Sequence, residues 1–113
     1  MDKFDTIWNN LQTTLKPGTE IKNWNTYHGY LGDSLTIKEV DPNYISLDPP
    51  RVWDTQVLPK EGFKKIWHVW ADYRALRLKR GEIGELTDSS KYIISILRWY
   101  ETEVISNKSQ VNE

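Results

Sequence analysis

The sequence predicts an α+β fold: an N-terminal helix, a three- to four-stranded, mainly antiparallel sheet, and two C-terminal helices packed on one face of that sheet. Two observations carry this prediction. Apolar residues recur with the helical period of 3.6 near both ends of the chain, and between them short stretches alternate apolar and polar residues around turn-forming residues. Because the expected strands follow one another through short connections, they should pair antiparallel.

Length and composition limit the classes of protein to which this chain can belong. The 113 residues suffice for one modest core, so residues 1–105 are expected to form a single α+β domain and residues 106–113 a disordered polar tail. The absence of cysteine excludes a disulfide scaffold, a thiol nucleophile and cysteine-ligated metal sites. No apolar run approaches the roughly 20 residues of a membrane helix, and residues 1–16 carry charges where a signal peptide is apolar. We therefore expect a cytoplasmic protein without membrane contact.

The first helix is predicted over residues 2–16. Its apolar residues share one helical face: Phe4, Ile7, Trp8, Leu11 and Leu15. The Pro17-Gly18 pair should end this helix, because proline disfavours a helical residue before it and glycine suits a helix terminus.

Four short strands are expected in the middle of the chain. Residues 19–24 form the first, with Ile21 on one face and Trp24 on the other, and residues 25–33 read as a loop or hairpin connection. Residues 34–40 and 44–47 form a β-hairpin around Asp41-Pro42-Asn43, which has the composition of a tight turn. Residues 55–58 form a fourth strand, with Val57 and Leu58 on opposite faces.

Two helices are expected in the last half. Residues 59–80 have the longest periodic pattern and predict one helix about 30 Å long, stopped by Gly81. A polar linker over 81–88 leads to a third helix over 90–105, which Asp88 or Ser89 can cap.

No motif in the sequence names a reaction, so a non-enzymatic role is the leading expectation and an enzyme stays a third option. His68 and Asp72 lie four apart on the expected helix but lack further metal or acid–base partners. Glu82 and Glu85 fall in the linker, where capping and solvation explain them. No catalytic residue, metal or cofactor is expected.

The strongest charge feature is basic. Residues 59–81 carry seven Lys or Arg against two Asp or Glu, although the whole chain has a net charge of −1. The alternative function is nucleic-acid binding, in which five cations would contact phosphates: Lys64, Arg74, Arg77, Lys79 and Arg80. On a continuous helix Arg74 would share a face with Arg77, and Arg77 with Arg80. Cations near a helix C-terminus also compensate the helix dipole, which is the competing interpretation.

Four aromatic residues outside the helical pattern are the candidates for binding a ligand or a partner. Trp24, Tyr27 and Tyr30 cluster in the glycine-bearing segment before the hairpin, and Trp53 lies in the connection before the long helix. Polar-tipped rings on loops can line a pocket or a self-association surface. They can equally fold back to cover the sheet.

Two segments give a resemblance. Asn23-Trp24, and the block LPKEGFKKIWHVWADY continuing through GEIGEL to SSKYIISIL, resemble a small bacterial domain family of unassigned activity found in mobile elements, including integron gene cassettes. The resemblance covers roughly residues 4–102. It implies a bacterial, cytoplasmic α+β protein, with a homodimer as one assembly to test, and it supplies no site residues.

Together these features predict a binding or interaction protein whose aromatic-rich surface mediates self-association or holds a small ligand or protein partner. The alternative is a nucleic-acid-associated accessory protein that uses the basic end of the long helix.

Overall fold

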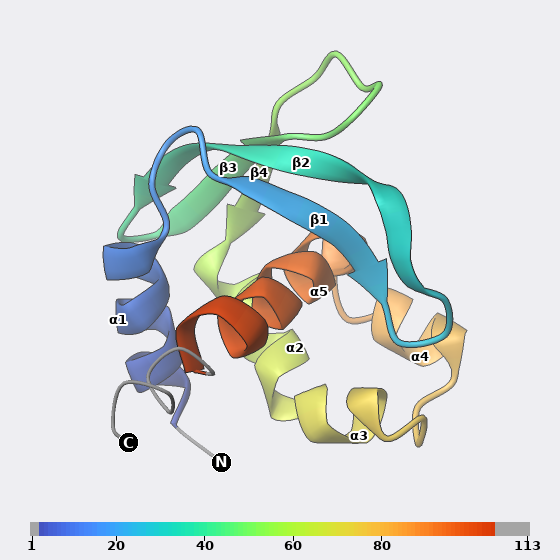
Figure 1. Cartoon of the computed structure of the whole chain (residues 1–113). Helices are drawn as coiled ribbons and strands as arrows, with labels where there is room; N and C mark the ends of the chain where they lie inside the picture. Colours follow the sequence, from blue (N-terminus) through green and yellow to red (C-terminus); the bar gives the residue numbers. More distant parts are fainter. Residues whose placement is uncertain (1–2, 106–113) are drawn as a thin grey trace, which may run out of the picture.

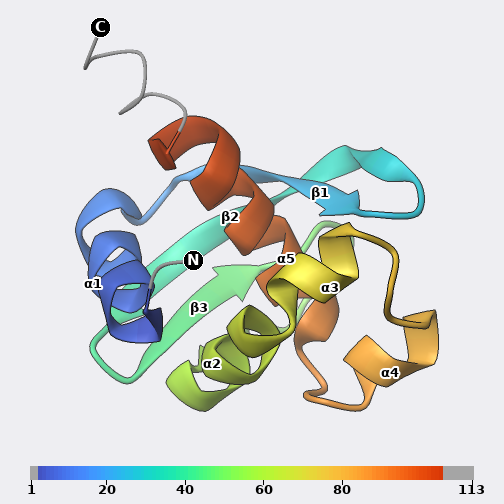
Figure 2. The same ribbon diagram turned by 90° about the horizontal axis from the view of Figure 1, so that it is seen from below.

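The computed structural model describes residues 3–105, with the side chain of Arg80 excepted, and shows the predicted α+β fold. A four-stranded antiparallel sheet forms one layer and the helices form the other, beneath it (Figure 1). Seen from below, α5 lies in front of β1 and β2, and α2 and α3 follow one another beside it (Figure 2). None of the helices in this part of the chain is long and apolar enough to cross a bilayer. The tail predicted over 106–113 lies outside the described residues.

The sheet follows the order of the chain, β1-β2-β3-β4. Its strands are β1 (Glu20–Asn25), β2 (Gly29–Asp41), β3 (Tyr44–Asp48) and β4 (Gln56–Pro59). The predicted hairpin is confirmed, since Asp41 pairs with Tyr44 and the Asp41 carboxylate accepts a hydrogen bond from the Asn43 backbone N–H at 2.9 Å. The predicted fourth strand is also confirmed, with Leu58 buried and Val57 exposed.

A bulge in the pairing of β1 with β2 accompanies one corrected prediction. The register shifts between Lys22 and Trp24: these residues are two apart on β1, whereas their partners Ser34 and Tyr30 are four apart on β2, so the extra residues lie on β2. Ile21 and Trp24, predicted on opposite faces, are both buried on the face that meets the helices. The loop predicted over 25–33 is also shorter than expected, because β2 begins at Gly29 and pairs it with Asn25.

Helix α1 (Phe4–Thr14) is confirmed, and its predicted apolar face is buried. Trp8 fixes this helix against the rest of the fold. Its indole N–H donates to the Pro42 carbonyl in the hairpin turn at 3.0 Å, and its ring packs edge-on against Phe63 at 5.1 Å between centroids. The N-terminal helix is thereby tied both to the sheet and to α2.

The single long helix predicted over 59–80 is wrong. Pro59 ends β4, and the segment divides into α2 (Lys60–His68), α3 (Trp70–Arg74) and α4 (Arg80–Gly84). Helix α2 stops where Val69 takes φ −113° and ψ 10°. Gly81, predicted to stop the helix, lies inside α4 instead, within the segment predicted to be a linker.

The end of α3 has a physical cause that the sequence does not indicate. Leu76 adopts a left-handed conformation with φ of 61°. Its N–H bonds the Tyr73 carbonyl at 3.1 Å and the next N–H, that of Arg77, bonds the Asp72 carbonyl at 2.9 Å. This is the Schellman pattern of helix termination, which usually has glycine at the left-handed position. A leucine there gives no sequence signal for the break.

The third predicted helix is confirmed in extent. It consists of α5 (Ser90–Trp99) and a π-helical continuation, η1 (Tyr100–Ile105). Ser89 occupies its N-cap position, without a capping hydrogen bond from its side chain. The Tyr100 hydroxyl accepts a hydrogen bond from the Asn10 side chain at 2.8 Å, so the end of α5 is tied to α1. Helix α5 packs directly against β1, and this contact positions the candidate site.

Candidate functional site

Two of the four aromatic residues that the sequence singles out lie together beside α3. The ring centroid of Trp24 is 6.3 Å from that of Trp70 and 6.4 Å from that of Tyr73, and Tyr27 lies 6.0 Å from Tyr73. Trp24 lies in β1 and is only 9% exposed, as in the alternative in which these rings fold back to cover the sheet. Its part in binding a ligand or a partner stays a prediction. Tyr27, in the turn between β1 and β2, is half-buried.

Two hydroxyl groups fasten the β1–β2 turn to the chain that follows α3. The Tyr27 hydroxyl donates to the Leu78 carbonyl at 2.7 Å, and the Tyr73 hydroxyl accepts a hydrogen bond from the Thr26 backbone N–H at 3.0 Å. The two tyrosine rings meet at 84°. The turn is therefore held in one position relative to α3 by partners about 50 residues away in the sequence.

This arrangement leaves a pocket of about 390 Å³ between the β1–β2 hairpin and helices α4 and α5, which we call the aromatic pocket. Its aromatic lining is Trp24, Tyr27 and Tyr73, its aliphatic lining Leu31, Ile83 and Ile94, and its remaining lining Asn23, Asn25, Gly84, Ser90 and Lys91. The lining thus combines aromatic and aliphatic side chains with several polar groups, and both kinds of group occur in small-molecule sites.

Asn25 supplies the best-defined polar group of the aromatic pocket. Its Oδ1 accepts hydrogen bonds from the backbone N–H groups of Tyr27 at 3.0 Å and His28 at 2.8 Å. These two bonds fix which end of the amide is oxygen. The Nδ2 group has no hydrogen-bond partner within residues 3–105, which leaves two donor hydrogens for a ligand.

Behind the aromatic pocket, Ser95 joins α5 to β1. Its buried hydroxyl accepts a hydrogen bond from the Trp24 backbone N–H at 3.0 Å and lies 3.2 Å from Asn23 Oδ1. The Asn23 amide donates to Asp33 at 2.8 Å, and Asp33 pairs with Arg51 at 3.0 Å. A continuous polar chain thus runs from the core at Trp24 to the loop that contains Trp53.

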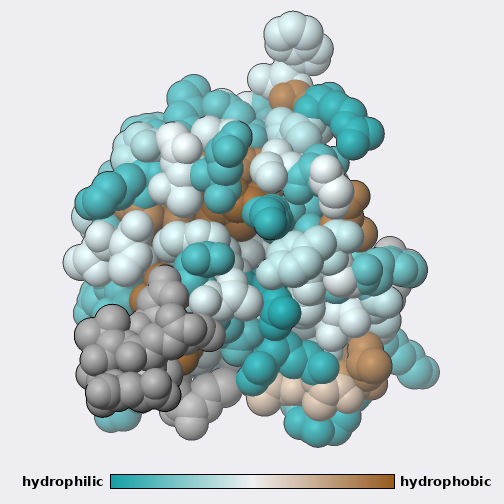
Figure 3. All heavy atoms as spheres, in the orientation of Figure 1, coloured by the Kyte–Doolittle hydropathy of each residue, from teal (hydrophilic) through white to brown (hydrophobic). Residues whose placement is uncertain are grey.

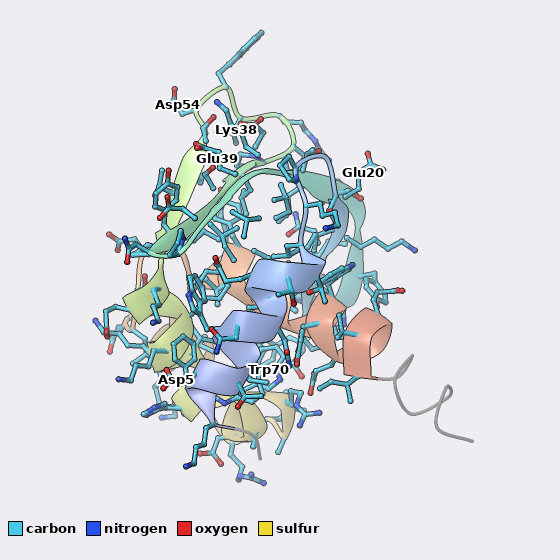
Figure 4. All side chains as sticks on the ribbon, turned by 90° about the vertical axis from the view of Figure 1, so that its left-hand side faces the viewer. Asp5, Glu20, Lys38, Glu39, Asp54 and Trp70 are labelled. Atoms are coloured by element: carbon cyan, nitrogen blue, oxygen red, sulfur yellow. The ribbon has the colours of Figure 1, made fainter. Side chains whose placement is uncertain are left out.

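The other two predicted aromatic residues lie apart from the aromatic pocket. Tyr30 is 53% exposed on β2 and lines a separate hollow with Lys22 and Arg98. Trp53 is 100% exposed in the connection from β3 to β4, which projects above the sheet (Figure 1). Figure 4 shows Asp54 of this connection at one end of the molecule and Trp70, in the helical layer, at the other. The four rings do not form one surface.

The connection that carries Trp53 is held by side-chain bonds at its base. The Thr55 hydroxyl donates to Asp48 at 2.7 Å and accepts from the Lys38 ammonium at 3.2 Å, while Arg51, with φ of 63°, makes its ion pair with Asp33. Trp53 is therefore exposed to solvent on a loop whose base is held by side-chain hydrogen bonds and an ion pair.

The predicted basic face on the long helix does not exist, because the helix ends at Arg74. Arg74 pairs with Glu101 at 3.1 Å and Arg77 with Asp72 at 2.8 Å, so both cations already have carboxylate partners. Lys64 is exposed on α2 and Lys79 is exposed just before α4. The side chain of Arg80 lies outside the described residues. Nucleic-acid binding by these five residues stays a prediction.

The titratable groups considered as catalytic do not converge. His68 ends α2, and Asp72, on α3, faces Arg77. The Glu82 carboxylate accepts the Lys79 backbone N–H at 2.9 Å and so starts α4, a structural role. In the part of the chain that the structure describes, no three His, Cys, Asp or Glu residues are grouped so that they could hold a metal ion.

The negative charge of Glu39 raises the pKa of Tyr44, with Asp41 acting in the same direction.

Sequence reasoning missed Tyr73, Asn25 and Ser95 as parts of the site. Tyr73 fits the apolar stripe of a helix, where it reads as core, and Ser95 reads as a polar residue on the last helix. Only Asn25, in a turn with glycine and aromatic residues, had a local signal.

Comparison of the chain with protein families, with curated proteins and with solved structures gives no match. The resemblance to a mobile-element domain family stays a prediction.

Proposed function

We propose that this chain is a non-enzymatic binding protein that holds a small, flat molecule with hydrogen-bond acceptors in the aromatic pocket. The observation that carries the proposal is the pairing of aromatic and aliphatic walls with the unpartnered amide donors of Asn25. The polar groups beside it are also donors: the Ser90 hydroxyl and the Lys91 ammonium line the same pocket. A ligand that brings acceptors, such as carbonyl or ring nitrogen atoms, complements them.

The walls of the aromatic pocket are prepared before a ligand arrives. Tyr27 and Tyr73 are held by hydroxyl hydrogen bonds to backbone groups, and Trp24 packs against both Trp70 and Tyr73. Rigid walls reduce the conformational entropy lost on binding, so a small molecule retains more of its interaction energy as affinity.

Two glycines of α4 provide a blocking variant and its control. Gly84 lines the aromatic pocket and Gly81 does not, and a Cβ atom added at either meets no atom within 4 Å. We expect a ligand found by NMR screening of flat heterocycles to bind at least ten-fold more weakly to Gly84→Leu and equally well to Gly81→Leu. Isothermal titration of the three proteins checks this. Equal binding to both variants would place the ligand elsewhere and contradict the proposal.

A finer variant tests the donor. Asn25→Asp keeps the oxygen that accepts from Tyr27 and His28, and replaces the amide donors with a second, charged oxygen. Since a hydrogen bond contributes about 0.5–1.5 kcal/mol, the loss of donation and the added negative charge should weaken a ligand that presents an acceptor about 3- to 10-fold or more.

Self-association through Trp53 is a second candidate, favoured by the full exposure of its ring on a braced loop. Tryptophan is enriched among residues that dominate binding energy at protein interfaces. On the face of the molecule in Figure 3, strongly hydrophobic residues show only in small areas among hydrophilic ones, so an anchor residue suits this surface better than a broad apolar contact.

Light scattering during size-exclusion chromatography tests this candidate. We expect the apparent mass to rise with protein concentration and to fall to the monomer value in Trp53→Ala. Leu76→Ala is the control, because Leu76 is an exposed apolar residue, 60% accessible, outside the loop. A monomeric wild-type protein at all concentrations, or equal loss in both variants, would refute association through Trp53.

A further inference from the structure

A second hollow, of about 350 Å³, lies between the β1–β2 hairpin and the end of α5, and we call it the Arg98 hollow. It is lined by residues of β1, β2, α5 and η1: Glu20, Lys22, Tyr30, Arg98, Trp99, Thr102 and Glu103. None of these residues lines the aromatic pocket. The two sites can therefore be tested separately.

Arg98 is held in this hollow by a ring and not by a carboxylate. Its guanidinium lies over the Trp24 ring, 4.7 Å from the centroid. Its Nε is buried and has no hydrogen-bond partner among the described residues. The other arginines whose side chains are described, Arg51, Arg74 and Arg77, each pair with a carboxylate. The buried Nε is out of reach of a ligand, but no hydrogen bond or ion pair joins the two Nη groups to the described residues either, so Arg98 retains Nη donors that a protein normally satisfies.

Lys22 repeats this arrangement. Its Nζ lies over the Tyr30 ring at 5.7 Å, and no ion pair joins it to a carboxylate within residues 3–105. Trp24 and Tyr30 are directly opposite each other in the β1–β2 pair. Aromatic residues at paired positions of β1 and β2 therefore each hold one of two cations that line the same hollow, through cation–π contacts that leave hydrogen-bond donors available.

We propose that the Arg98 hollow binds a small molecule that joins a carboxylate to an apolar ring. The planar guanidinium presents paired donors that match a carboxylate, and Lys22 adds a second positive charge. Tyr30 and Trp99 provide apolar surface for the ring. The proposal stands on Arg98 and Lys22 and does not depend on the function of the aromatic pocket.

The charge of the hollow selects a carboxylate over a phosphate. Glu20 and Glu103 line it together with Arg98 and Lys22, so the formal charges of the lining cancel. Both carboxylates are exposed and repel a second negative charge on a ligand. A monoanion is bound with less repulsion than a dianion.

Benzoate, phenyl phosphate and acetate are the probes, titrated into the full chain at low salt and followed by amide and indole NMR signals. We expect benzoate to bind saturably with a Kd of about 1 mM or tighter. Acetate, which lacks the ring, and phenyl phosphate, which carries the second charge, should each bind at least several-fold more weakly. Absence of saturation by benzoate would overturn the proposal, and stronger binding of phenyl phosphate would overturn its charge selection.

Three variants locate the site. Arg98→Met keeps an unbranched stem on Trp24 but removes the charge, and should abolish benzoate binding. Arg98→Lys keeps the charge without the paired donors, and should bind about three- to ten-fold more weakly. Arg51→Gln is the control, because Arg51 does not line the hollow, and should bind as the wild type does. Unchanged binding in Arg98→Lys and in Arg98→Met, with folding verified by the dispersion of the amide spectrum, would refute a role for the guanidinium.

Discussion

Replacement of Trp70 by alanine is expected to lower the free energy of unfolding by about 3–5 kcal/mol, the range observed for removing a large buried aromatic side chain. Trp70 is fully buried, and its ring centroid lies 5.6 Å from that of Tyr73 and 6.3 Å from that of Trp24. Its loss opens a cavity beside Tyr73, whose ring cannot move far to fill it without breaking the hydrogen bond between its hydroxyl and the Thr26 N–H. Urea unfolding followed by far-ultraviolet circular dichroism measures the change.

Trp70→Phe distinguishes the contribution of the indole N–H to stability from that of the aromatic ring. The Nε1 of Trp70 is buried and has no hydrogen-bond partner in the described part of the chain. Phenylalanine removes this unsatisfied donor and keeps an aromatic ring. The free energy gained by removing the donor therefore offsets part of the free energy lost because the ring is smaller. We expect Trp70→Phe to cost less than half as much as Trp70→Ala. Equal costs would show that the indole N–H is satisfied, contrary to the geometry described above.

The fold class could be predicted because it depends on local patterns. The apolar stripe of residues 4–15 and the alternation on either side of Asp41-Pro42-Asn43 each need only a short window of sequence, and both are confirmed. The prediction of one long helix failed because the backbone breaks first at Val69 and again at Leu76, which adopts a conformation that usually requires glycine. An apolar stripe shows which residues are buried, but not where the backbone breaks between them.

The site could be predicted only in part, because its contacts join distant residues. The segment containing Trp24, Tyr27 and Tyr30 was recognised, but strand pairing and the bulge direct these rings to different places. Trp24 enters the core, Tyr27 packs on Tyr73 of α3, and Tyr30 borders the Arg98 hollow. Nothing near Arg98 in the sequence reveals that its guanidinium lies over the ring of Trp24.

Ser95→Ala is expected to lower the free energy of unfolding by about 1–3 kcal/mol, the usual cost of leaving a buried donor unpaired. Strand β1 lies at the edge of the sheet, so its outward backbone N–H groups have no partner strand. For Trp24 the acceptor is the hydroxyl of Ser95 on α5. Urea unfolding gives the energy, and faster hydrogen exchange of the Trp24 amide in the variant would identify the broken bond.

Ser46→Ala is the matched control for this effect. Ser46 is as buried as Ser95, at 1% against 0% exposure, but its hydroxyl has no hydrogen-bond partner among the described residues. Removing an unsatisfied buried hydroxyl should leave stability unchanged within about 0.5 kcal/mol or raise it. If the two substitutions cost the same, the loss at Ser95 would reflect packing, and the hydrogen bond that joins α5 to β1 would contribute nothing of its own. A cost confined to Ser95 would show that this bond holds β1, and with it Trp24, against the helical layer.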